Sequence, residues 1–182
     1  MKNLRVSEEI ELRPVTLNDV EDIFCTIDRE RKYLGRWLPF VEHTRNKEDS
    51  RLFIQGVMTS SDGPADIVYV IRYEGLFAGL IGHKFTDRAN LKTEIGYWIS
   101  ERFQGKGIIT RSVRAMITQA FEVWGFHRIQ INVATGNKRS KRIPKKLGFT
   151  FEGIARDAEL LTSGFTDIET FALLKNEWKN AL

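Results

Sequence analysis

The feature of this chain that most constrains its fold is a junction between a strand and a helix that contains two closely spaced glycines. The junction lies in EIGYWISERFQGKGIITRSVRAMITQAFEVWGF, residues 94–126. Before the glycines, side chains alternate between the two faces of a predicted strand, with Ile95, Tyr97 and Ile99 on one face and Glu94, Gly96 and Trp98 on the other. After them, apolar side chains recur every three or four residues: Ile109, Val113, Met116, Ile117, Ala120 and Trp124. This spacing predicts an amphipathic helix that lies on a sheet.

The two glycines, Gly105 and Gly107, predict an anion-binding loop. Glycine lets the backbone turn sharply and approach a ligand closely, and the unpaired N–H groups at a helix start favour a phosphate or pyrophosphate. Three nearby cationic side chains add positive charge: Arg102, Lys106 and Arg111. An ordinary turn is the alternative interpretation, because the spacing matches neither the dinucleotide fingerprint nor the P-loop.

The remaining segments predict an α+β fold. The strand patterns are IELRPV at residues 10–15, DIVYVIRY and GLFAGLIGHKF joined by a tight turn at Glu74-Gly75, HRIQINVAT, TFEGIARDAEL and TDIETFALLK. Helices are expected from Thr16 or Asn18 to about Tyr33, from Asn46 or Lys47 to a turn at residues 60–64, and from about Lys138 to Leu147. The order β-α-α-β-β-β-α-β-α-β-β indicates a mixed, mostly antiparallel sheet flanked by helices and excludes a doubly wound nucleotide fold.

Length and composition favour a single domain over residues 1–182. Of the 182 residues, 42% are hydrophobic, which is enough for one well-packed core. No apolar run approaches the roughly 20 residues of a membrane helix, and the N-terminus lacks the apolar segment of a signal peptide, so we expect a cytoplasmic protein. Cys25 is the only cysteine and the three histidines lack metal-ligand spacing, so we expect no disulfide within the chain and no metal site.

Several motifs make the chain resemble the GCN5-related N-acetyltransferases (GNAT). RFQGKG, residues 102–107, is similar to the [Q/R]-x-x-G-x-[G/A] loop that binds the pyrophosphate of acetyl-coenzyme A (acetyl-CoA) in that family. EIGYWI before this loop, NKRS after the next strand and KKLGF at the end of the short helix agree with it, and the likeness extends from ELRPV to LLKNEW. The resemblance implies the GNAT acyl-CoA N-acyltransferase fold, acetyl-CoA as donor, no metal, and these cofactor-binding residues: Gln104, Gly105, Lys106, Gly107, Ile108, Ile109 and Thr110.

Within the family, WLPF, IGYWI and N-x-x-S followed by K-x-G-F resemble the branch that acetylates ribosomal-protein N-termini. The resemblance implies acetyl transfer to a primary amine, with the N-terminal α-amine of a ribosomal protein as the expected acceptor, by direct attack in a ternary complex. A small amine, such as a polyamine, an aminoglycoside or an amino-acid derivative, is the alternative acceptor. A non-catalytic acetyl-CoA sensor or an RNA-binding module is the alternative class of protein, although the sequence has no RNP-type aromatic motif.

Two side chains are the expected catalytic groups. Glu94, at a position similar to the glutamate base of histone-modifying relatives, would remove the amine proton through a water, and a salt bridge is its alternative role. Ser140 stands at the N-x-x-S serine that the resembled branch is thought to use beside the departing thiolate, whereas Pro144 occupies the place of the tyrosine acid of many other members. Asn137 would hold the pantetheine arm. In the alternative interpretation Asn137 caps the short helix and Ser140 lies in its first turn.

The end of the strand before the glycine loop is expected to supply backbone groups. The resemblance implies that main-chain groups of Trp98 and Ile99 bind pantetheine and stabilise the oxyanion. The indole of Trp98 is expected to pack in the core instead.

The family places the acceptor groove between the loop after the first helix, here LGRWLPFVEH, and the last hairpin, here RDAELLTSGF. These segments hold aromatic and acidic side chains that suit a cationic amine: Trp37, Phe40, Glu42, Asp157 and Glu159. The aromatic pair and the exposed sheet edges, together with the dimers common in the resembled branch, favour a homodimer or a larger closed oligomer.

The run NKRSKRIPKK, residues 137–146, contains six basic residues. It is compatible with contact to the 3′-phosphate of coenzyme A, with RNA binding or with a solvated helix face. The net charge of +4 does not separate these three interpretations. Pro144 inside the run predicts a short or kinked helix.

Overall fold

One eight-stranded sheet organises the chain in this computed structural model, which describes residues 2–59 and 66–178. The strands, in the order in which they lie side by side, are β1 (Leu4–Arg5), β2 (Ile10–Pro14), β3 (Val68–Tyr73), β4 (Leu76–Asp87), β5 (Lys92–Ile99), β6 (Arg128–Ala134), β8 (Gly164–Leu174) and β7 (Thr150–Leu161). Every neighbouring pair is antiparallel except β5 and β6, which are parallel. The predicted α+β fold with a mostly antiparallel sheet is confirmed.

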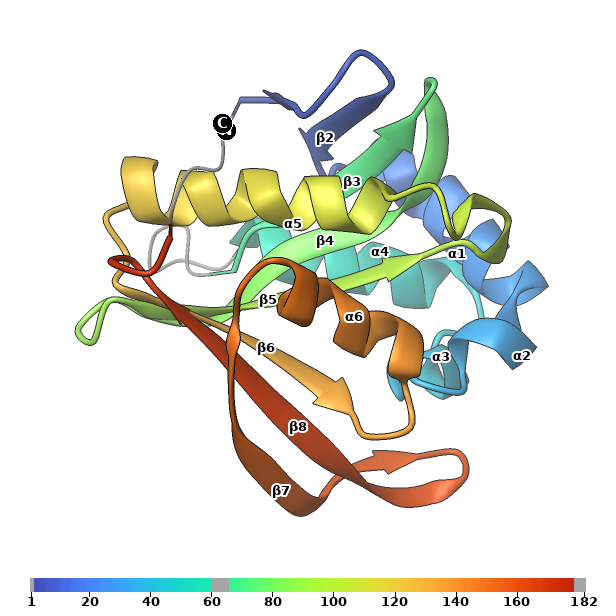
Figure 1. Cartoon of the computed structure of the whole chain (residues 1–182). Coiled ribbons are helices and arrows are strands. Elements are labelled where there is room, and N and C mark those ends of the chain that lie inside the picture. The colour runs from blue at the N-terminus through green and yellow to red at the C-terminus, as the bar shows by residue number, and fades with distance from the viewer. Residues whose placement is uncertain (1, 60–65, 179–182) are drawn as a thin grey trace.

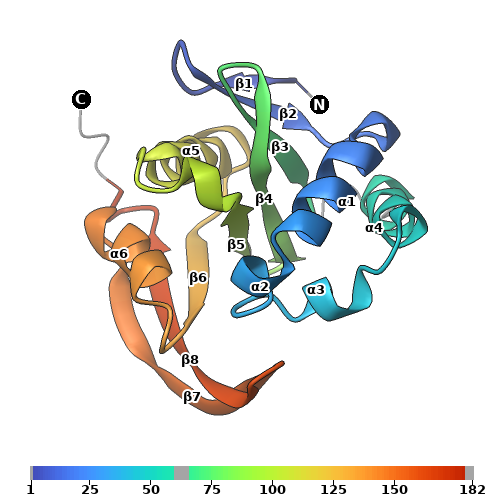
Figure 2. The same ribbon diagram turned by 90° about the vertical axis from the view of Figure 1, so that its right-hand side faces the viewer.

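Helices cover both faces of the sheet, as Figures 1 and 2 show. Helices α1 (Val20–Arg29) and α4 (Lys47–Thr59) lie on one face, and α5 (Ile108–Thr118) lies on the other. The short helices α2 (Arg31–Leu34) and α3 (Phe40–His43) connect α1 to α4, and α6 (Lys138–Lys146) follows β6. No helix in the described parts of the chain is long and apolar enough to cross a membrane.

The side-chain alternation of β5 divides the core into two clusters. Ile95 packs with the buried stripe of α5, which includes Val113 and Met116. Trp98, on the opposite face of the strand, packs with α1 and α4 through residues such as Ile23 and Ile54. Because successive strand residues point to opposite faces, a single strand contributes to both cores, as its pattern predicted.

Most of the predicted elements occur, with differences at their ends. The Glu74-Gly75 hairpin turn, the α4 start at Lys47 and the last two strands are confirmed. The first helix does not continue unbroken to Tyr33, because it ends at Arg29 and α2 begins after Glu30. The helix predicted as far as Trp124 changes at Gln119–Val123 to a π-helical turn. The predicted turn at residues 60–64 lies outside the described residues.

Short elements that the sequence did not predict complete the fold. They are β1, α3 and the 3₁₀ turn Glu101–Phe103, whereas α2 and the 3₁₀ turn Leu17–Asp19 fall within the predicted first helix. Each is four residues or shorter, which is too short for a helical pattern or a strand alternation to repeat. Their positions depend on tertiary contacts rather than on a local signal.

The parallel pair β5 and β6 separates soon after it begins. The two strands pair only where Lys92–Glu94 lies beside Arg128–Gln130. From there β5 continues along β4 as far as Ile99, while β6 continues along β8 as far as Ala134. The second half of β5 therefore has a paired strand on one side only, and its other edge is open.

We predict that Gly79, where β4 passes close to β5, is required for stability. A Cβ atom at this position would lie 2.2 Å from the carbonyl oxygen of Trp98. Gly79→Ala should therefore push the strands apart and lower the free energy of unfolding by about 1–3 kcal/mol, as overpacking of a core does. Urea unfolding measures this change.

The control variant is Gly56→Ala on α4, where an added Cβ would meet no atom within 4 Å. Alanine is the better helix former, so this variant should gain about 0.5–1 kcal/mol of stability. A Gly79→Ala protein as stable as the wild type would contradict the close approach of the two strands.

Candidate active site

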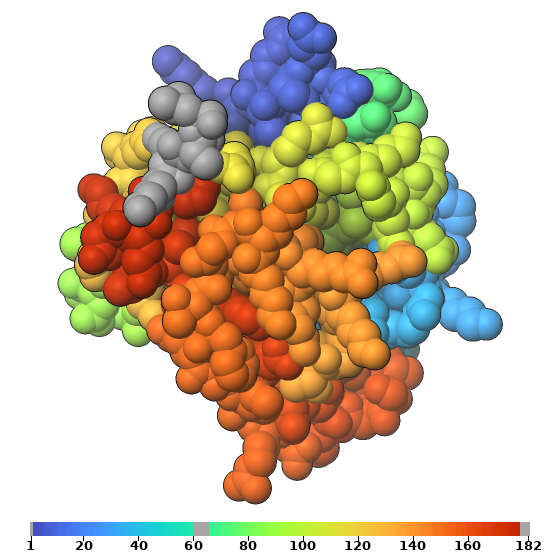
Figure 3. Space-filling view, viewed as in Figure 1, coloured from blue at the N-terminus to red at the C-terminus, as the bar shows by residue number. Residues whose placement is uncertain are grey.

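A cleft of about 590 Å³ lies between the end of β5, the start of α5 and helix α6. Figure 3 shows the surface hollowed between the orange α6 and the yellow-green residues before α5. The predicted cofactor residues that line it are Trp98, Ile99, Gln104, Gly105, Gly107, Ile108, Ile109, Thr110, Asn137 and Ser140. The structure therefore brings together in one cleft residues that lie up to about 40 positions apart in the sequence.

The glycine loop has the backbone that an anion site requires. Gly105 and Gly107 have φ angles of +75° and +71°, in the left-handed region that residues with a Cβ rarely adopt. Gly107 is the N-cap residue of α5, and no described side chain caps this helix end. The first N–H groups of α5 are therefore open to the cleft at the positive end of the helix dipole.

A half-buried carboxylate holds the start of this loop. Glu30 accepts hydrogen bonds from the Ser100 hydroxyl at 2.6 Å and from the Glu101 backbone N–H at 2.8 Å. These contacts tie the end of β5 to the end of α1, 70 residues earlier in the chain. They also account for the break between α1 and α2, because the chain turns where the Glu30 carboxylate reaches the loop.

The cationic side chains predicted around the loop do not line the cleft. The Lys106 ammonium lies 4.8 Å from the centre of the Tyr73 ring. Arg111 forms an ion pair with Glu9 at 3.3 Å, and the Arg102 guanidinium stacks 4.4 Å from the centre of the Phe103 ring. Neighbouring aromatic and acidic groups attract these side chains away, so their charges are already partly compensated.

Helix α6 supplies the positive charge instead. Arg139, Arg142 and Lys146 line the cleft, at a spacing of three and four residues that places them on one face of the helix. Lys141 points elsewhere and forms an ion pair with Glu169. Of the three interpretations of the basic run, contact with a bound anion is the one that this geometry favours.

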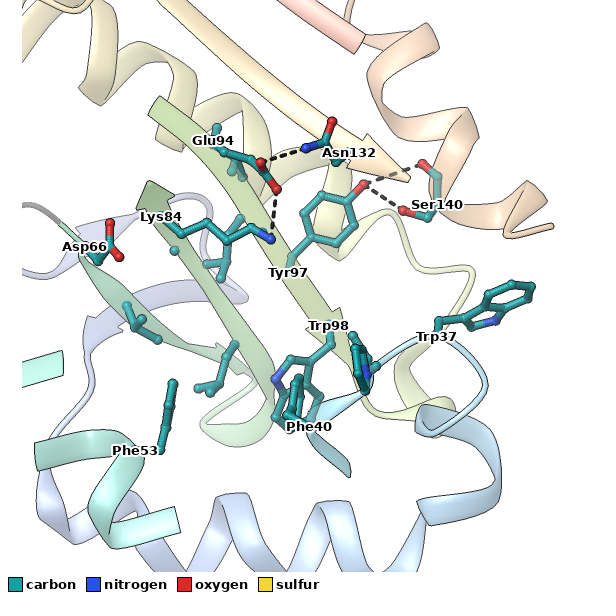
Figure 4. Close-up of a pocket in the computed structure, with 18 of the residues that line it drawn as sticks. Trp37, Phe40, Phe53, Asp66, Lys84, Glu94, Tyr97, Trp98, Asn132 and Ser140 are labelled. Atoms are coloured by element: carbon teal, nitrogen blue, oxygen red, sulfur yellow. Dashed lines mark hydrogen bonds and ion pairs between the residues drawn. The ribbon is translucent and has the colours of Figure 1, made fainter. Parts of the chain in front are cut away.

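A second cavity, of about 540 Å³, opens on the other side of β5 (Figure 4). Its lining includes three of the predicted acceptor residues, Trp37, Phe40 and Glu159, together with Phe53 and Asp66. Its apolar walls come from α1, α4, β4, β5 and β6.

Two predicted acceptor residues lie outside this cavity. Glu42 is exposed on α3, and its backbone oxygen accepts a hydrogen bond from the Arg45 side chain at 3.2 Å. Asp157 is exposed on β7, with a φ of +48° and its N–H bonded to the Asp167 carboxylate at 2.9 Å. It lies within an irregularity between Ala155 and Glu159, where the strand register shifts and the period-two alternation is lost.

Glu94 is buried and paired. Its carboxylate forms an ion pair with the Lys84 ammonium at 2.8 Å and accepts a hydrogen bond from the Asn132 amide at 2.8 Å (Figure 4). Lys84 and Glu94 are cross-strand partners in the β4–β5 ladder, which explains why they meet. The salt bridge that was the alternative role of Glu94 is therefore present, although the carboxylate is buried rather than exposed on the strand.

Glu159 is another carboxylate that lines this cavity, together with Asp49, Asp66 and Glu94. The register shift in β7 directs it inward, and among the described residues it has no hydrogen-bond or ion-pair partner. Burial raises the pKa of Glu159; the nearby Lys84 charge opposes the shift and the Glu94 charge adds to it. A carboxylate that is unpaired and less acidic than usual is better suited to accept a proton than one held in an ion pair.

The two cavities meet at the open edge of β5. Asn137, Tyr97 and Ser140 line both of them. The Asn137 side chain accepts a hydrogen bond from the Ser140 N–H at 3.1 Å, so Asn137 caps α6 as the alternative interpretation predicted. The Tyr97 hydroxyl lies 3.0 Å from the Ser140 hydroxyl oxygen (Figure 4).

Tyr97 was not predicted as a site residue. Its alternation with Ile95 and Ile99 indicated only which face of the strand it occupies. The contact with Ser140 joins residues 43 positions apart, and no local pattern in the sequence specifies it. Burial raises the pKa of Tyr97 to about 12, partly opposed by the hydrogen bond with Ser140.

The hydrogen-bond ladder shows which backbone groups of β5 remain open. The Ser100 N–H donates to Ala78 on β4, at 2.8 Å. Because alternate residues of an antiparallel strand direct their N–H and C=O groups to the same neighbour, the backbone of Trp98 also faces β4. The backbone groups of Tyr97 and Ile99 therefore face the open edge where the cavities meet. The Trp98 indole packs in the core, as expected.

The described residues contain no group of three or more His, Cys, Asp or Glu side chains that could hold a metal ion. The polar groups of the site include backbone amides, the carboxylates of Glu94 and Glu159, and the hydroxyls of Tyr97 and Ser140. Such groups are typical of group transfer that relies on positioning, hydrogen bonding and proton transfer.

Comparison with known proteins identifies the class of this chain. Residues 9–150 match the family model described as an acetyltransferase (GNAT) domain. The chain is 35% identical over 182 residues to the Bacillus subtilis protein named "Putative ribosomal N-acetyltransferase YdaF", with 98% of each protein covered. It is 29% identical over 172 residues to the ribosomal-protein-serine acetyltransferase of Escherichia coli, covering 94% of this chain and 96% of that protein.

A solved structure agrees with these sequence relatives. The fold matches the Microcin C7 self immunity acetyltransferase MccE in complex with acetyl-CoA and AMP with a TM-score of 0.88 and 27% identity, covering 94% of this chain and 95% of that one. The fold and the paired cavities thus define an acyl-transferring enzyme. The chain belongs to the GNAT acetyltransferase family and is an N-acetyltransferase, which confirms the resemblance and the enzyme class expected from the sequence.

We predict that Gly107→Asp weakens the binding of acetyl-CoA by roughly 10-fold or more, because a carboxylate at the open N-terminus of α5 would repel a bound pyrophosphate. Gly125→Asp is a matched control. Gly125 has a φ of +73°, close to that of Gly107, and a Cβ at either position would meet no atom within 4 Å. Calorimetry should show normal affinity for the control, and a folded Gly107→Asp protein with normal affinity would contradict the pyrophosphate assignment.

Proposed function

We propose that this N-acetyltransferase moves the acetyl group of acetyl-CoA to the N-terminal α-amine of a ribosomal protein, by direct attack within a ternary complex. The observation that carries the proposal is the pair of cavities on the two sides of β5, which meet at Tyr97, Asn137 and Ser140. The two cavities also share Trp37, Leu38 and Trp98, so ligands in both would come into contact along this common wall, as a direct transfer requires.

The first cavity suits acetyl-CoA. The amides at the start of α5 would receive the pyrophosphate, and Arg139, Arg142 and Lys146 would neutralise the phosphates of the coenzyme. The open backbone groups of Tyr97 and Ile99 would pair with the amides of the pantetheine arm, as an added strand does. The acetyl-CoA complex of the related MccE supports this donor.

The open edge of β5 would also stabilise the reaction's oxyanion. The Ile99 N–H faces this edge, whereas the Trp98 N–H faces β4, so Ile99 is the better placed of the two predicted residues. A fixed backbone N–H aimed at the developing negative charge requires little reorganisation during the reaction.

The base in this proposal is Glu159, and Glu94 remains in its ion pair with Lys84. An α-amine has a pKa of about 7.7–8, so an N-terminal acceptor needs only modest help to lose its proton. Glu159 is unpaired among the described residues and its pKa is raised, whereas Glu94 is held by Lys84 and Asn132. This assignment revises the expectation that Glu94 is the base.

In this proposal the leaving group, the thiolate of coenzyme A, accepts a hydrogen bond from the Ser140 hydroxyl. As the C–S bond breaks, the electron pair moves to sulfur, and a hydroxyl that donates a hydrogen bond there stabilises the thiolate. The intrinsic pKa of a thiol, about 8.5, makes this a tolerable leaving group once it is hydrogen-bonded.

The acceptor assignment rests on the relatives and on the second cavity. Two relatives carry ribosomal-protein acetyltransferase names. The cavity combines carboxylates that attract an amine with apolar walls, including Phe40 and Phe53, that suit the side chains of an N-terminal peptide. Such an acceptor implies action in the cytoplasm, where ribosomal proteins are made.

We further propose that the chain forms a closed homo-oligomer. Strand β7 is a 12-residue edge of the sheet, and it exposes Phe151, Ile154 and Leu160. Long exposed apolar edges are usually covered in native proteins. Light scattering at micromolar concentration that gives only the 21.0 kDa monomer would refute this proposal.

Acceptor screening by mass spectrometry tests the function. The purified protein is incubated with acetyl-CoA and with peptides that carry ribosomal-protein N-termini, the same peptides with blocked α-amines, polyamines and aminoglycosides. We expect a single added acetyl group on the free α-amine of a peptide. Acetylation of small amines alone would refute the protein acceptor, and coenzyme A release with no amine of the panel would refute the enzymatic role.

We predict that Glu159→Gln lowers kcat/KM for the amine by about 10²-fold or more, the usual contribution of a general base. Because the pKa of Glu159 is raised and the base must be ionised, wild-type activity should fall as the pH decreases through that pKa, and the variant should lose this dependence. Glu94→Gln, which removes an equal charge from the same cavity, is the matched control. A larger loss of kcat in Glu94→Gln than in Glu159→Gln would indicate that Glu94, and not Glu159, is the general base.

A further inference from the structure

We propose that Tyr97 is a positioning residue for acetyl transfer: it holds the Ser140 hydroxyl in the orientation that donates to the thioester sulfur. This inference rests on the proposed function, because it assigns a task within the same reaction centre. The two hydroxyl oxygens lie 3.0 Å apart, and the Tyr97 hydroxyl is 3.5 Å from the Ser140 carbonyl oxygen (Figure 4).

The two partners of this contact differ in mobility. Tyr97 lies on β5 in the middle of the sheet, and its ring packs against the core cluster beneath α5. Ser140 lies in the first turn of α6, partly exposed to the cleft. A serine hydroxyl turns freely about its C–O bond, so an isolated Ser140 would spend only part of its time aimed at the sulfur. Contact with a fixed tyrosine restricts that rotation.

The direction of the hydrogen bond follows from chemistry. Burial raises the pKa of Tyr97 to about 12, so the phenol keeps its proton at neutral pH. A phenol is a stronger donor than an aliphatic alcohol, and Tyr97 therefore donates to the Ser140 oxygen. The Ser140 proton is then left for another acceptor. At the meeting point of the two cavities, that acceptor is the sulfur of the donor.

Pro144 changes the hydrogen bonding of the helical turn that contains Ser140. In a regular helix the carbonyl of Ser140 would accept the N–H of residue 144, four positions later. Proline has no N–H, so this carbonyl lacks its usual partner, and it lies 3.5 Å from the Tyr97 hydroxyl, whose single proton goes to the nearer Ser140 hydroxyl oxygen. Pro144 also occupies the position at which many other family members carry the tyrosine acid. Tyr97 brings a phenol to this turn from the neighbouring strand instead.

The chemical step balances without any further reactant. The amine nitrogen attacks the thioester carbonyl carbon, the C–N bond forms, and the C–S bond breaks with its electron pair on sulfur. The amine proton passes to Glu159. The Ser140 hydroxyl donates a hydrogen bond to the thiolate while Tyr97 donates to Ser140, and neither hydroxyl needs to lose its proton. Solvent later protonates the thiolate of the released coenzyme A.

A double-mutant cycle tests the proposal. Tyr97→Phe and Ser140→Ala should each lower kcat by about 10-fold, the loss expected for a hydrogen bond to a charged group, with less than about a twofold change in KM for acetyl-CoA. If Tyr97 acts through Ser140, the double variant should be no slower than Ser140→Ala alone. Losses that multiply would show that Tyr97 acts independently, and an unchanged kcat in Tyr97→Phe would overturn the proposal.

Tyr69→Phe is the matched control. Tyr69 is also buried, and its hydroxyl accepts a hydrogen bond from the Gln119 side chain at 3.0 Å, outside both cavities. It should lower stability without changing kcat. A loss of kcat in Tyr69→Phe equal to that in Tyr97→Phe would mean that any buried tyrosine hydroxyl has this effect, and it would refute a specific role.

A second measurement does not depend on an acceptor. The pKa of the thiol of bound coenzyme A is obtained by titrating its thiolate absorbance in the ultraviolet. Tyr97→Phe should raise this pKa by about one unit, which corresponds to a 10-fold effect, whereas Tyr69→Phe should not change it. An equal thiol pKa in wild type and Tyr97→Phe would overturn the positioning role. Failure of the wild type to bind coenzyme A would refute the proposed function itself, so the two failures are distinguishable.

Discussion

The early separation of β5 from β6 is the feature on which the rest of the site depends. Pairing between β5 and β6 stops after Glu94, and beyond that point β5 remains paired with β4 alone and β6 with β8 alone. The separation leaves one edge of β5 unpaired in the middle of the sheet rather than at its margin. Backbone groups that would otherwise complete a ladder are left open, and cavities lie next to this open edge.

The charges of the site are arranged so that each cavity attracts a different ligand. The cleft between β5, α5 and α6 is lined by cationic side chains of α6 and by open amides at the start of α5, and both suit phosphates. The second cavity is lined by carboxylates, including those of Glu94 and Glu159, and these suit an amine. Lys84 forms an ion pair with Glu94, whereas Glu159 has no ion-pair partner among the described residues. The same short stretch of β5 separates the two environments.

The motifs that could be predicted from the sequence are those governed by local geometry. The left-handed backbone of Gly105 and Gly107, the N-cap at Asn137 and the apolar stripe of α5 each involve residues within a few positions of one another. The directions of long charged side chains could not be predicted in this way. Lys106 and Arg111 turn toward Tyr73 and Glu9, partners that come from the early strands and are invisible to a local pattern.

The sequence by itself therefore determined the order of the longer strands and helices, the glycine loop and the family. Only the tertiary structure decided how distant residues act together. It paired Glu94 with Lys84, directed Glu159 inward at a shift of register in β7, and brought Tyr97 to Ser140 beside a proline-interrupted turn. The physical reason is that periodicity and capping depend on neighbours along the chain, whereas a reaction centre depends on where strands separate and which side chains meet across the gap.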